Sequence, residues 1–187
     1  MKKNAKWIIV AVLAVIVCVY CISTYNSLAR QEQEVDTAWA NVEAQYQRRA
    51  DLIPNLVATV QGYAKHEQET FKQVVDARAK ALGTSGSIEE YAEAQQQVTA
   101  ALGRLIAISE NYPELKADAN FLELQAQLEG TENRITVARS EYNEQVKKFN
   151  TATVTFPSNL IAGMFGFEKK SLFIASEGAA QAPQGQS

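Results

Sequence analysis

An uncharged apolar segment lies close to the N-terminus. From Trp7 to Ile22 the sequence reads WIIVAVLAVIVCVYCI, and extension to Tyr25 gives 19 residues, or ~28 Å of helix against a hydrocarbon core of ~30 Å. Ten of these residues are valine, isoleucine or leucine, which favour transfer into lipid. We therefore predict a transmembrane helix over residues 7–25, with these membrane-anchoring side chains: Trp7, Ile8, Ile9, Val10, Val12, Leu13, Val15, Ile16, Val17, Val19, Tyr20, Ile22 and Tyr25.

Basic residues set the predicted orientation of this helix. Lys2, Lys3 and Lys6 precede it, whereas only Arg30 follows closely. By the positive-inside rule, residues 1–6 lie in the cytoplasm and the body of the chain lies outside the cytoplasmic (inner) membrane. A cleaved signal peptide is the alternative, but the apolar run is longer than usual and no A-x-A cleavage site follows it.

The chain after this segment carries the three- and four-residue spacing of amphipathic helices. The first stripe is interrupted only by Arg49, and we expect its helix to continue as far as Leu82, with a kink near Ala50 caused by Pro54. Residues 83–87, GTSGS, form the first predicted loop. The stripe consists of Val35, Trp39, Val42, Tyr46, Ile53, Leu56, Val60 and Tyr63.

Two further helices are predicted from the same periodicity. Ser87 and Glu90 have the spacing of a capping box at the start of the second helix, and Pro113 ends that helix. The β-branched segment 151–156, TATVTF, is expected to be an extended connector. The stripe of the second helix is Tyr91, Ala94, Val98, Ala101, Leu105, Ile108 and Tyr112, and that of the last helix is Phe121, Leu124, Leu128, Thr131, Ile135, Ala138, Tyr142, Val146 and Phe149.

These elements predict an all-α fold, in which an N-terminal transmembrane helix is followed by a long antiparallel three- to four-helix bundle. The bundle covers residues 26–174, and residues 175–187, rich in Ala, Gln, Gly, Ser and Pro, are predicted to be a disordered polar tail. Gly62, Gly103 and Gly130 lie inside predicted helices, where glycine costs ~1 kcal/mol relative to alanine. We expect close helix approach at these glycines, and a local break in the helix, especially at Gly130, is the alternative.

Charge and composition exclude several classes of function. All 21 acidic side chains lie after Tyr25. Of the 18 basic side chains, three lysines precede Tyr25 and 15 follow it. The body is therefore acidic and should repel nucleic acid. Cys18 and Cys21 lie in the apolar segment as small apolar residues, and the single histidine, His66, is interpreted as a surface residue. With no glycine-rich phosphate loop and no H-E-x-x-H motif, we predict no catalytic site, metal site or cofactor.

Arg49 occupies a stripe position where an apolar residue is due. A lone buried guanidinium would be heavily penalised, so the side chain needs a partner. One hypothesis is an ion pair with Glu132, which stands next to Thr131 in the stripe of the last helix and would fix the helix register. The alternative is that Arg49 extends its charged end to water.

An uncovered apolar segment follows the last long helix. It has three interpretations: packing onto the open end of its own bundle, contact with a bilayer, or contact with a neighbouring subunit. The candidate interaction surface consists of Leu160, Ile161, Met164, Phe165, Phe167 and Phe173.

Five segments of the chain form a recognisable series: YNSL at 25–28, AWANVEAQYQRRADLIPNLVATVQGYAKHE at 38–67, YPELKADANFLELQAQLEGTENRI at 112–135, ARSEYNEQV at 138–146 and FPSNLIAGMFGF at 156–167. Together they resemble the LemA family, in order and spacing from the apolar segment to about Phe173. The resemblance implies a bacterial protein with one N-terminal span, a mostly extracytoplasmic helical bundle and no established catalytic activity. It assigns no functional roles to single residues.

Two functions remain from the sequence. The first is a non-enzymatic, membrane-anchored scaffold that self-associates at the cell envelope, because apolar residues such as Tyr63, Phe71 and Phe165 leave surface for neighbouring copies to cover. Its partners would be the lipid bilayer and further copies of the chain. The alternative is an extracytoplasmic sensor or adaptor bundle that binds an envelope protein and modulates a membrane enzyme. A polar pocket between helices would mark that alternative, and the sequence pattern indicates none.

Overall fold

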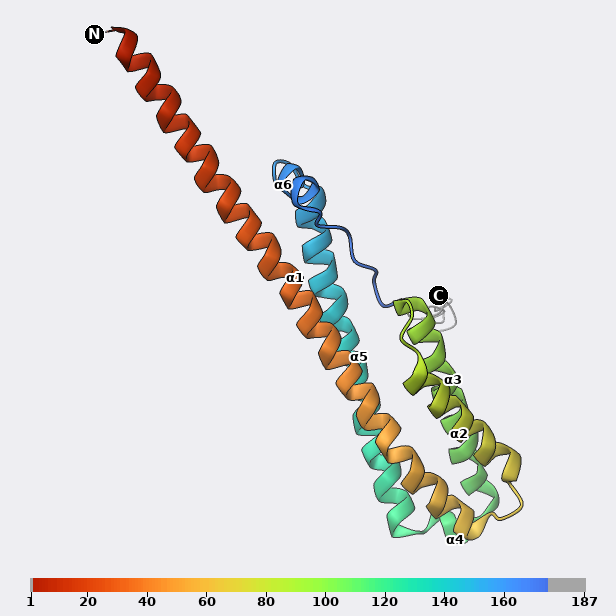
Figure 1. The fold of residues 1–187 in the computed structure, drawn as a ribbon. Helices are drawn as coiled ribbons and strands as arrows, with labels where there is room; N and C mark the ends of the chain where they lie inside the picture. Colours follow the sequence, from red (N-terminus) through yellow and green to blue (C-terminus); the bar gives the residue numbers. More distant parts are fainter. Residues whose placement is uncertain (1, 175–187) are drawn as a thin grey trace, which may run out of the picture. The chain divides into compact units, whose positions relative to one another are not determined.

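The computed structural model describes residues 2–174, with side chains from Trp7 onward. The predicted polar tail over residues 175–187 lies outside this range. All regular secondary structure of the described residues is helical, which confirms the all-α class (Figure 1). The elements in chain order are α1 Lys2–Tyr63, α2 Gln68–Gly83, α3 Ile88–Ile108, η1 Ser109–Asn111, α4 Pro113–Lys116, α5 Ala119–Val154 and α6 Ser158–Phe165.

The chain forms two compact units, and each contains a part of α1 and a part of α5. Of the described residues, 2–39 and 142–171 make the first unit, whereas 40–141 and 172–174 make the second. We describe the two units separately.

The second unit is a bundle built from α2, α3 and the adjoining parts of α1 and α5. Most residues of its apolar stripes are buried as predicted, although Tyr63 at the end of the first stripe is exposed. Leu56, Val60, Leu105 and Leu115 have no exposed surface. Ser87 and Glu90 form the predicted capping box at the start of α3, with each side chain bonded to the other residue's backbone N–H.

The first long helix ends earlier than predicted, at Tyr63. The chain turns at residues 64–67, AKHE, and α2 packs back against α1, which buries Phe71 and Val74 in the shared core. The expected continuation to Leu82 is therefore wrong. The turn contains neither glycine nor proline, so no local signal marks it, and burial of the apolar face of α2 against α1 decides the conformation instead.

Pro54 lies inside α1 and leaves one carbonyl without its usual helical partner. Because proline has no N–H, the carbonyl of Ala50, four residues earlier, loses its donor. Arg78 of α2 replaces it, and its Nε donates a 2.8 Å hydrogen bond to the Ala50 oxygen. The α1 helix continues through the proline, and the substitute donor ties α2 to α1.

Residues 151–154 belong to α5 rather than to an extended connector. Three threonine hydroxyls donate to helix carbonyls three or four residues earlier: Thr151 to Lys147, Thr153 to Asn150 and Thr155 to Thr151. These bonds satisfy the hydroxyl groups within the helix, so the β-branched run does not force an extended backbone.

The predicted close approach of helices at glycine is also wrong. A Cβ atom added at Gly62 or Gly103 would meet nothing within 4 Å, and at Gly130 it would meet only Arg134 Nη2 at 3.7 Å. These glycines therefore cost helical stability without a packing gain.

Replacement of Gly103 and Gly130 by alanine is expected to raise the free energy of unfolding by about 0.5–1 kcal/mol each. Urea denaturation followed by circular dichroism measures this change. Gly166 is the matched control, because its φ of 77° is a left-handed conformation that alanine adopts at a cost. Gly166→Ala should destabilise the protein. Equal effects at all three sites would contradict the conclusion that Gly103 and Gly130 only weaken their helices.

The first unit pairs the earlier part of α1 with the end of α5 and with α6. Trp39 packs against Tyr142 with ring centroids 5.2 Å apart, and Lys148 of α5 forms a 3.0 Å ion pair with Glu34 of α1. Asn150 fixes the segment that follows α6, because its side chain exchanges two 2.8 Å hydrogen bonds with the backbone of Lys170. These bonds tie the segment after α6 to the end of α5 within the first unit.

Candidate functional site

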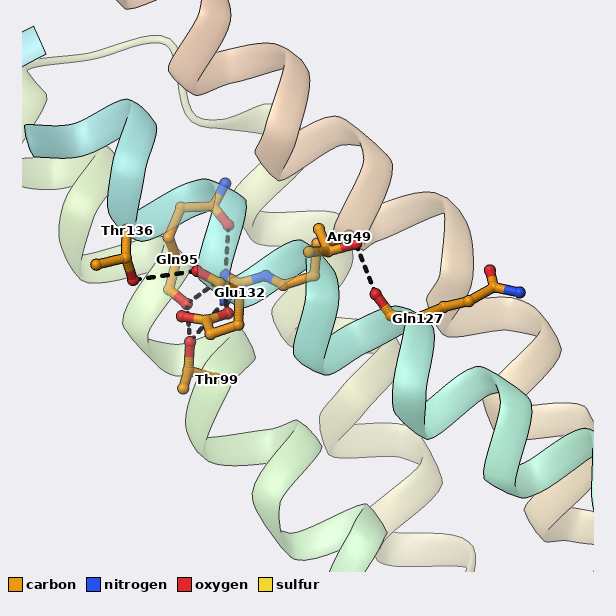
Figure 2. A network of polar contacts seen from close by, with 7 residues as sticks. Arg49, Gln95, Thr99, Gln127, Glu132 and Thr136 are labelled. Atoms are coloured by element: carbon orange, nitrogen blue, oxygen red, sulfur yellow. Dashed lines mark hydrogen bonds and ion pairs between the residues drawn. The ribbon is translucent and has the colours of Figure 1, made fainter. Parts of the chain in front are cut away.

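The most distinctive polar feature of the second unit is a buried arginine. Arg49 is 2% exposed, and its guanidinium meets residues of α3 and α5 (Figure 2). Nη1 donates to Glu132 Oε2 at 2.9 Å and to Thr99 Oγ1 at 2.8 Å, and Nη2 donates to the backbone oxygen and to Oε1 of Gln95, both at 2.9 Å. The structure thus brings together Arg49 and Glu132, as hypothesised from the sequence, and it excludes the alternative in which Arg49 extends to water.

Sequence reasoning missed the other half of this network. Gln95 and Thr99 stand one turn apart on α3, and together they accept three of the four hydrogen bonds that the two terminal nitrogens donate. Gln95 lies one position beside the apolar stripe of α3, so it could have been identified as a buried polar residue. The Arg49 guanidinium also lies 4.9 Å from the ring centroid of Tyr46, which adds a cation–π contact.

Burial raises the pKa of two tyrosines around this network. It raises the pKa of Tyr46, although Arg139 and Arg49 oppose the rise. Burial and the nearby Glu43 carboxylate raise the pKa of Tyr91 to about 12. Both phenols therefore remain neutral well above neutral pH.

A groove of about 630 Å³, lined by both apolar and charged side chains, adjoins the network in the same unit. Glu132 forms part of its wall with a 48% exposed side chain, so its carboxylate faces both Arg49 and solvent. Arg139 lines another part, and its guanidinium carbon lies 4.4 Å from the centroid of Phe173. The sequence pattern does not predict this groove, because residues 172–174, which form part of its wall, have no helical periodicity.

The apolar N-terminal part of α1 is exposed along its whole described length. Residues from Trp7 onward form a helix long and apolar enough to cross a membrane, and the predicted large apolar side chains of the anchor are all exposed. Aromatic contacts mark the end of this segment: the Tyr25 ring lies 4.8 Å from Phe165 and 5.7 Å from Phe167, centroid to centroid. The end of the apolar segment and α6 are therefore neighbours in the first unit.

A family model described as LemA family matches residues 38–186, which is more than half of the chain. The chain belongs to the LemA family. The N-terminal apolar segment at residues 7–25 precedes the matched region.

Curated relatives of this LemA-family chain carry two kinds of name. Protein LemA of Metamycoplasma hominis is 26% identical over 152 residues, which cover 81% of this chain and 69% of that protein. Magnetosome protein MamQ 2 of Paramagnetospirillum magneticum is 25% identical, covering 88% of this chain and 70% of the relative. Magnetosome protein MamQ of Magnetospirillum gryphiswaldense is 26% identical, and the match covers 80% of this chain and 64% of that relative.

Only some residues of the candidate interaction surface of this LemA-family protein are exposed. Ile161 and Phe173 are buried and Phe167 is half-buried, so these three residues pack within the protein itself. Leu160, Met164 and Phe165 are exposed, and Phe156, which sequence reasoning did not include, is 75% exposed. Phe71, earlier expected to face a neighbouring copy, belongs to the core, because α2 folds back onto α1.

Asp118 joins the start of α5 to the end of α1 in this LemA-family bundle. Its Oδ1 accepts the backbone N–H of Phe121 at 2.8 Å, and its Oδ2 accepts the hydroxyl of Tyr63 at 2.8 Å. The hydrogen bond from Phe121, followed by that from Tyr63, holds the pKa of Asp118 below its usual 3.8.

The lowered pKa of Asp118 predicts a pH-dependent effect of its removal. Because the folded state holds the carboxylate ionised, its contribution to stability is present above pH 3.8 and is lost as the pH falls through the lower folded-state pKa. Asp118→Ala should therefore lower the melting temperature at pH 7, and the difference from the parent protein should shrink towards pH 3. A melting-temperature difference that stays constant from pH 7 to pH 3 would be inconsistent with a stabilising role of the ionised Asp118 carboxylate at the start of α5.

Proposed function

We propose that this LemA-family protein is a non-enzymatic scaffold, anchored in the cytoplasmic membrane by residues 7–25, that self-associates through this span. Its N-terminus faces the cytoplasm and its bundle lies outside. Three lysines before the span and one nearby arginine after it support this orientation. The exposed apolar helix supports the single span, because 19 such residues match the bilayer thickness.

The observation that carries self-association is a stripe of small residues on the span. Ala11, Ala14, Cys18 and Cys21 follow steps of three, four and three along α1, so they share one face of the helix. All other residues from Trp7 to Ile22 are large and apolar. Small side chains let two helix backbones approach closely, which is how helices associate in lipid, where the hydrophobic effect does not drive them together.

Size measurement of the full-length protein in nanodiscs or mild detergent tests this proposal. We expect a uniform oligomer in multi-angle light scattering and in electron microscopy. The double substitution Ala14→Ile with Cys18→Ile should dissociate it, because bulky side chains then separate the small faces. The matched control, Val12→Leu with Ile16→Leu, changes large residues on other faces and should leave the oligomer intact. A monomeric parent protein would overturn the proposal.

The groove beside Glu132 favours a second candidate, the extracytoplasmic adaptor. Glu132 and Arg139 place opposite charges on its wall, beside the aromatic ring of Phe173. Such a wall suits a polar ligand or a segment of an envelope protein. A monomeric full-length protein in the size measurement would make this candidate the better account, because an adaptor requires no self-association.

A further inference from the structure

We propose that α6 and the turn before it form a second membrane contact, in which their exposed apolar side chains lie in the lipid interface beside the span. This inference rests on the proposed span at residues 7–25. Its partner is the bilayer surface itself, and it assigns a role to side chains that the bundle leaves uncovered.

The first observation is that α6 is apolar on both of its faces. Ile161 and Ala162 point into the protein and are buried. The opposite face, which faces water in an ordinary surface helix, carries Leu160 and Met164, and Met164 is 74% exposed. Ser158 and Asn159 are the only polar residues of α6, and both lie in its first turn. A helix whose remaining surface is apolar on both faces belongs in a protein core or in contact with lipid, and the outward face of α6 has no covering element in the described chain.

The second observation is the absence of charge around this helix. From Phe149 to Phe167 the sequence FNTATVTFPSNLIAGMFGF contains no charged residue, and Lys148 and Glu168 bound the run. Its exposed large apolar side chains come from the end of α5, the turn and α6. They are Val154, Phe156, Leu160, Met164 and Phe165.

The third observation shows which part of α1 lies next to α6. Tyr25 ends the apolar segment, where tyrosine commonly lies at the boundary between lipid and water. Its ring contacts Phe165 and Phe167 at 4.8 Å and 5.7 Å between centroids. If residues 7–25 cross the bilayer, α6 therefore lies where the span leaves the hydrocarbon.

The bilayer accounts for this surface better than a second copy does. The apolar surface continues directly from the exposed span through Tyr25 to α6, so one lipid phase covers both without a further binding partner. The chain then leaves the interface, because Gly166 ends α6 in the left-handed conformation and the exposed Lys169 follows. A lysine at this position suits the anionic headgroups above the acyl chains.

Electron paramagnetic resonance of the full-length protein in phospholipid vesicles tests the contact. Cys18→Ala and Cys21→Ala remove the native thiols while keeping the side chains small. Single cysteines at Met164, Val15 and Thr37 then carry a nitroxide, whose collision rates with oxygen and with a water-soluble nickel complex report its depth. Thr37 is the control within the same unit, because it is exposed on α1 about 18 Å beyond Tyr25.

We expect the nitroxide at Met164 to lie ~5–10 Å below the headgroup boundary, that at Val15 deep in the hydrocarbon and that at Thr37 in water. A label at Met164 as accessible to nickel as the one at Thr37, with Val15 still in lipid, would overturn this inference and leave the span intact. A label at Met164 shielded from both reagents, with spin–spin broadening, would overturn it in favour of a second copy. A water-exposed label at Val15 would overturn the proposed span itself.

Discussion

Replacement of Arg49 by methionine is expected to lower the free energy of unfolding by about 2–4 kcal/mol, because buried acceptors lose their donor. Gln95 is buried, and its backbone and side-chain oxygens both lose the hydrogen bonds that Arg49 Nη2 donates. Glu132 is half exposed and can turn to water, which keeps the loss below that of a fully buried ion pair.

A double-mutant cycle separates the ion pair from the rest of this network. Glu132→Gln should cost about 1 kcal/mol, and combination with Arg49→Met should show a coupling energy of about 1 kcal/mol in urea unfolding. Lys148→Met is the control, because Lys148 and Glu34 form an exposed pair between α5 and α1, for which about 0–1 kcal/mol is expected. Strict additivity of the Arg49 and Glu132 substitutions would show that their contact does not fix the helix register.

Loss of the Arg78 side chain is expected to destabilise the bundle by about 1–2 kcal/mol, because the Ala50 carbonyl then has no donor. The cause is testable through Pro54. In a Pro54→Ala background, the new backbone N–H can bond to Ala50 within the helix, so Arg78→Met should cost much less there. Chemical denaturation of the four variants gives the coupling between the two sites.

Arg104 provides the matched control for Arg78. It is exposed on α3 and donates a 2.7 Å hydrogen bond to Gln73 of α2, so it also links two helices, but at the surface. Arg104→Met should change stability little in either background. If Arg78→Met lowers the free energy of unfolding equally in the parent protein and in the Pro54→Ala background, Arg78 does not act by replacing the donor that Pro54 lacks.

The sequence predicted those features that depend on local periodicity. The stripes of α3 and α5, the capping box at Ser87 and the pairing of Arg49 with Glu132 all follow from spacing along single helices. A charged residue in an apolar stripe requires a partner, and Glu132 was identified because it adjoins the facing stripe.

The features that sequence reasoning missed depend on tertiary contacts. The turn at residues 64–67 has no breaker residue, so only the packing of Phe71 into the core determines it. The donor that compensates for Pro54 is Arg78, on another helix. The groove beside Glu132 requires the return of Phe173, which follows no regular element. These contacts join residues distant in sequence, and a local pattern contains no information on them.

Disulfide trapping in membranes tests the central claim, that the spans of two copies meet through their small faces. A disulfide requires two Cα atoms within about 7 Å, so it forms only where helices approach closely. With Cys21→Ala, Cys18 is the sole cysteine, and copper-phenanthroline oxidation should give a covalent dimer. A cysteine at Ile16, on the opposite face of a chain lacking both native cysteines, should give none. Absence of a dimer at Cys18, or equal dimer formation at both positions, would contradict the account.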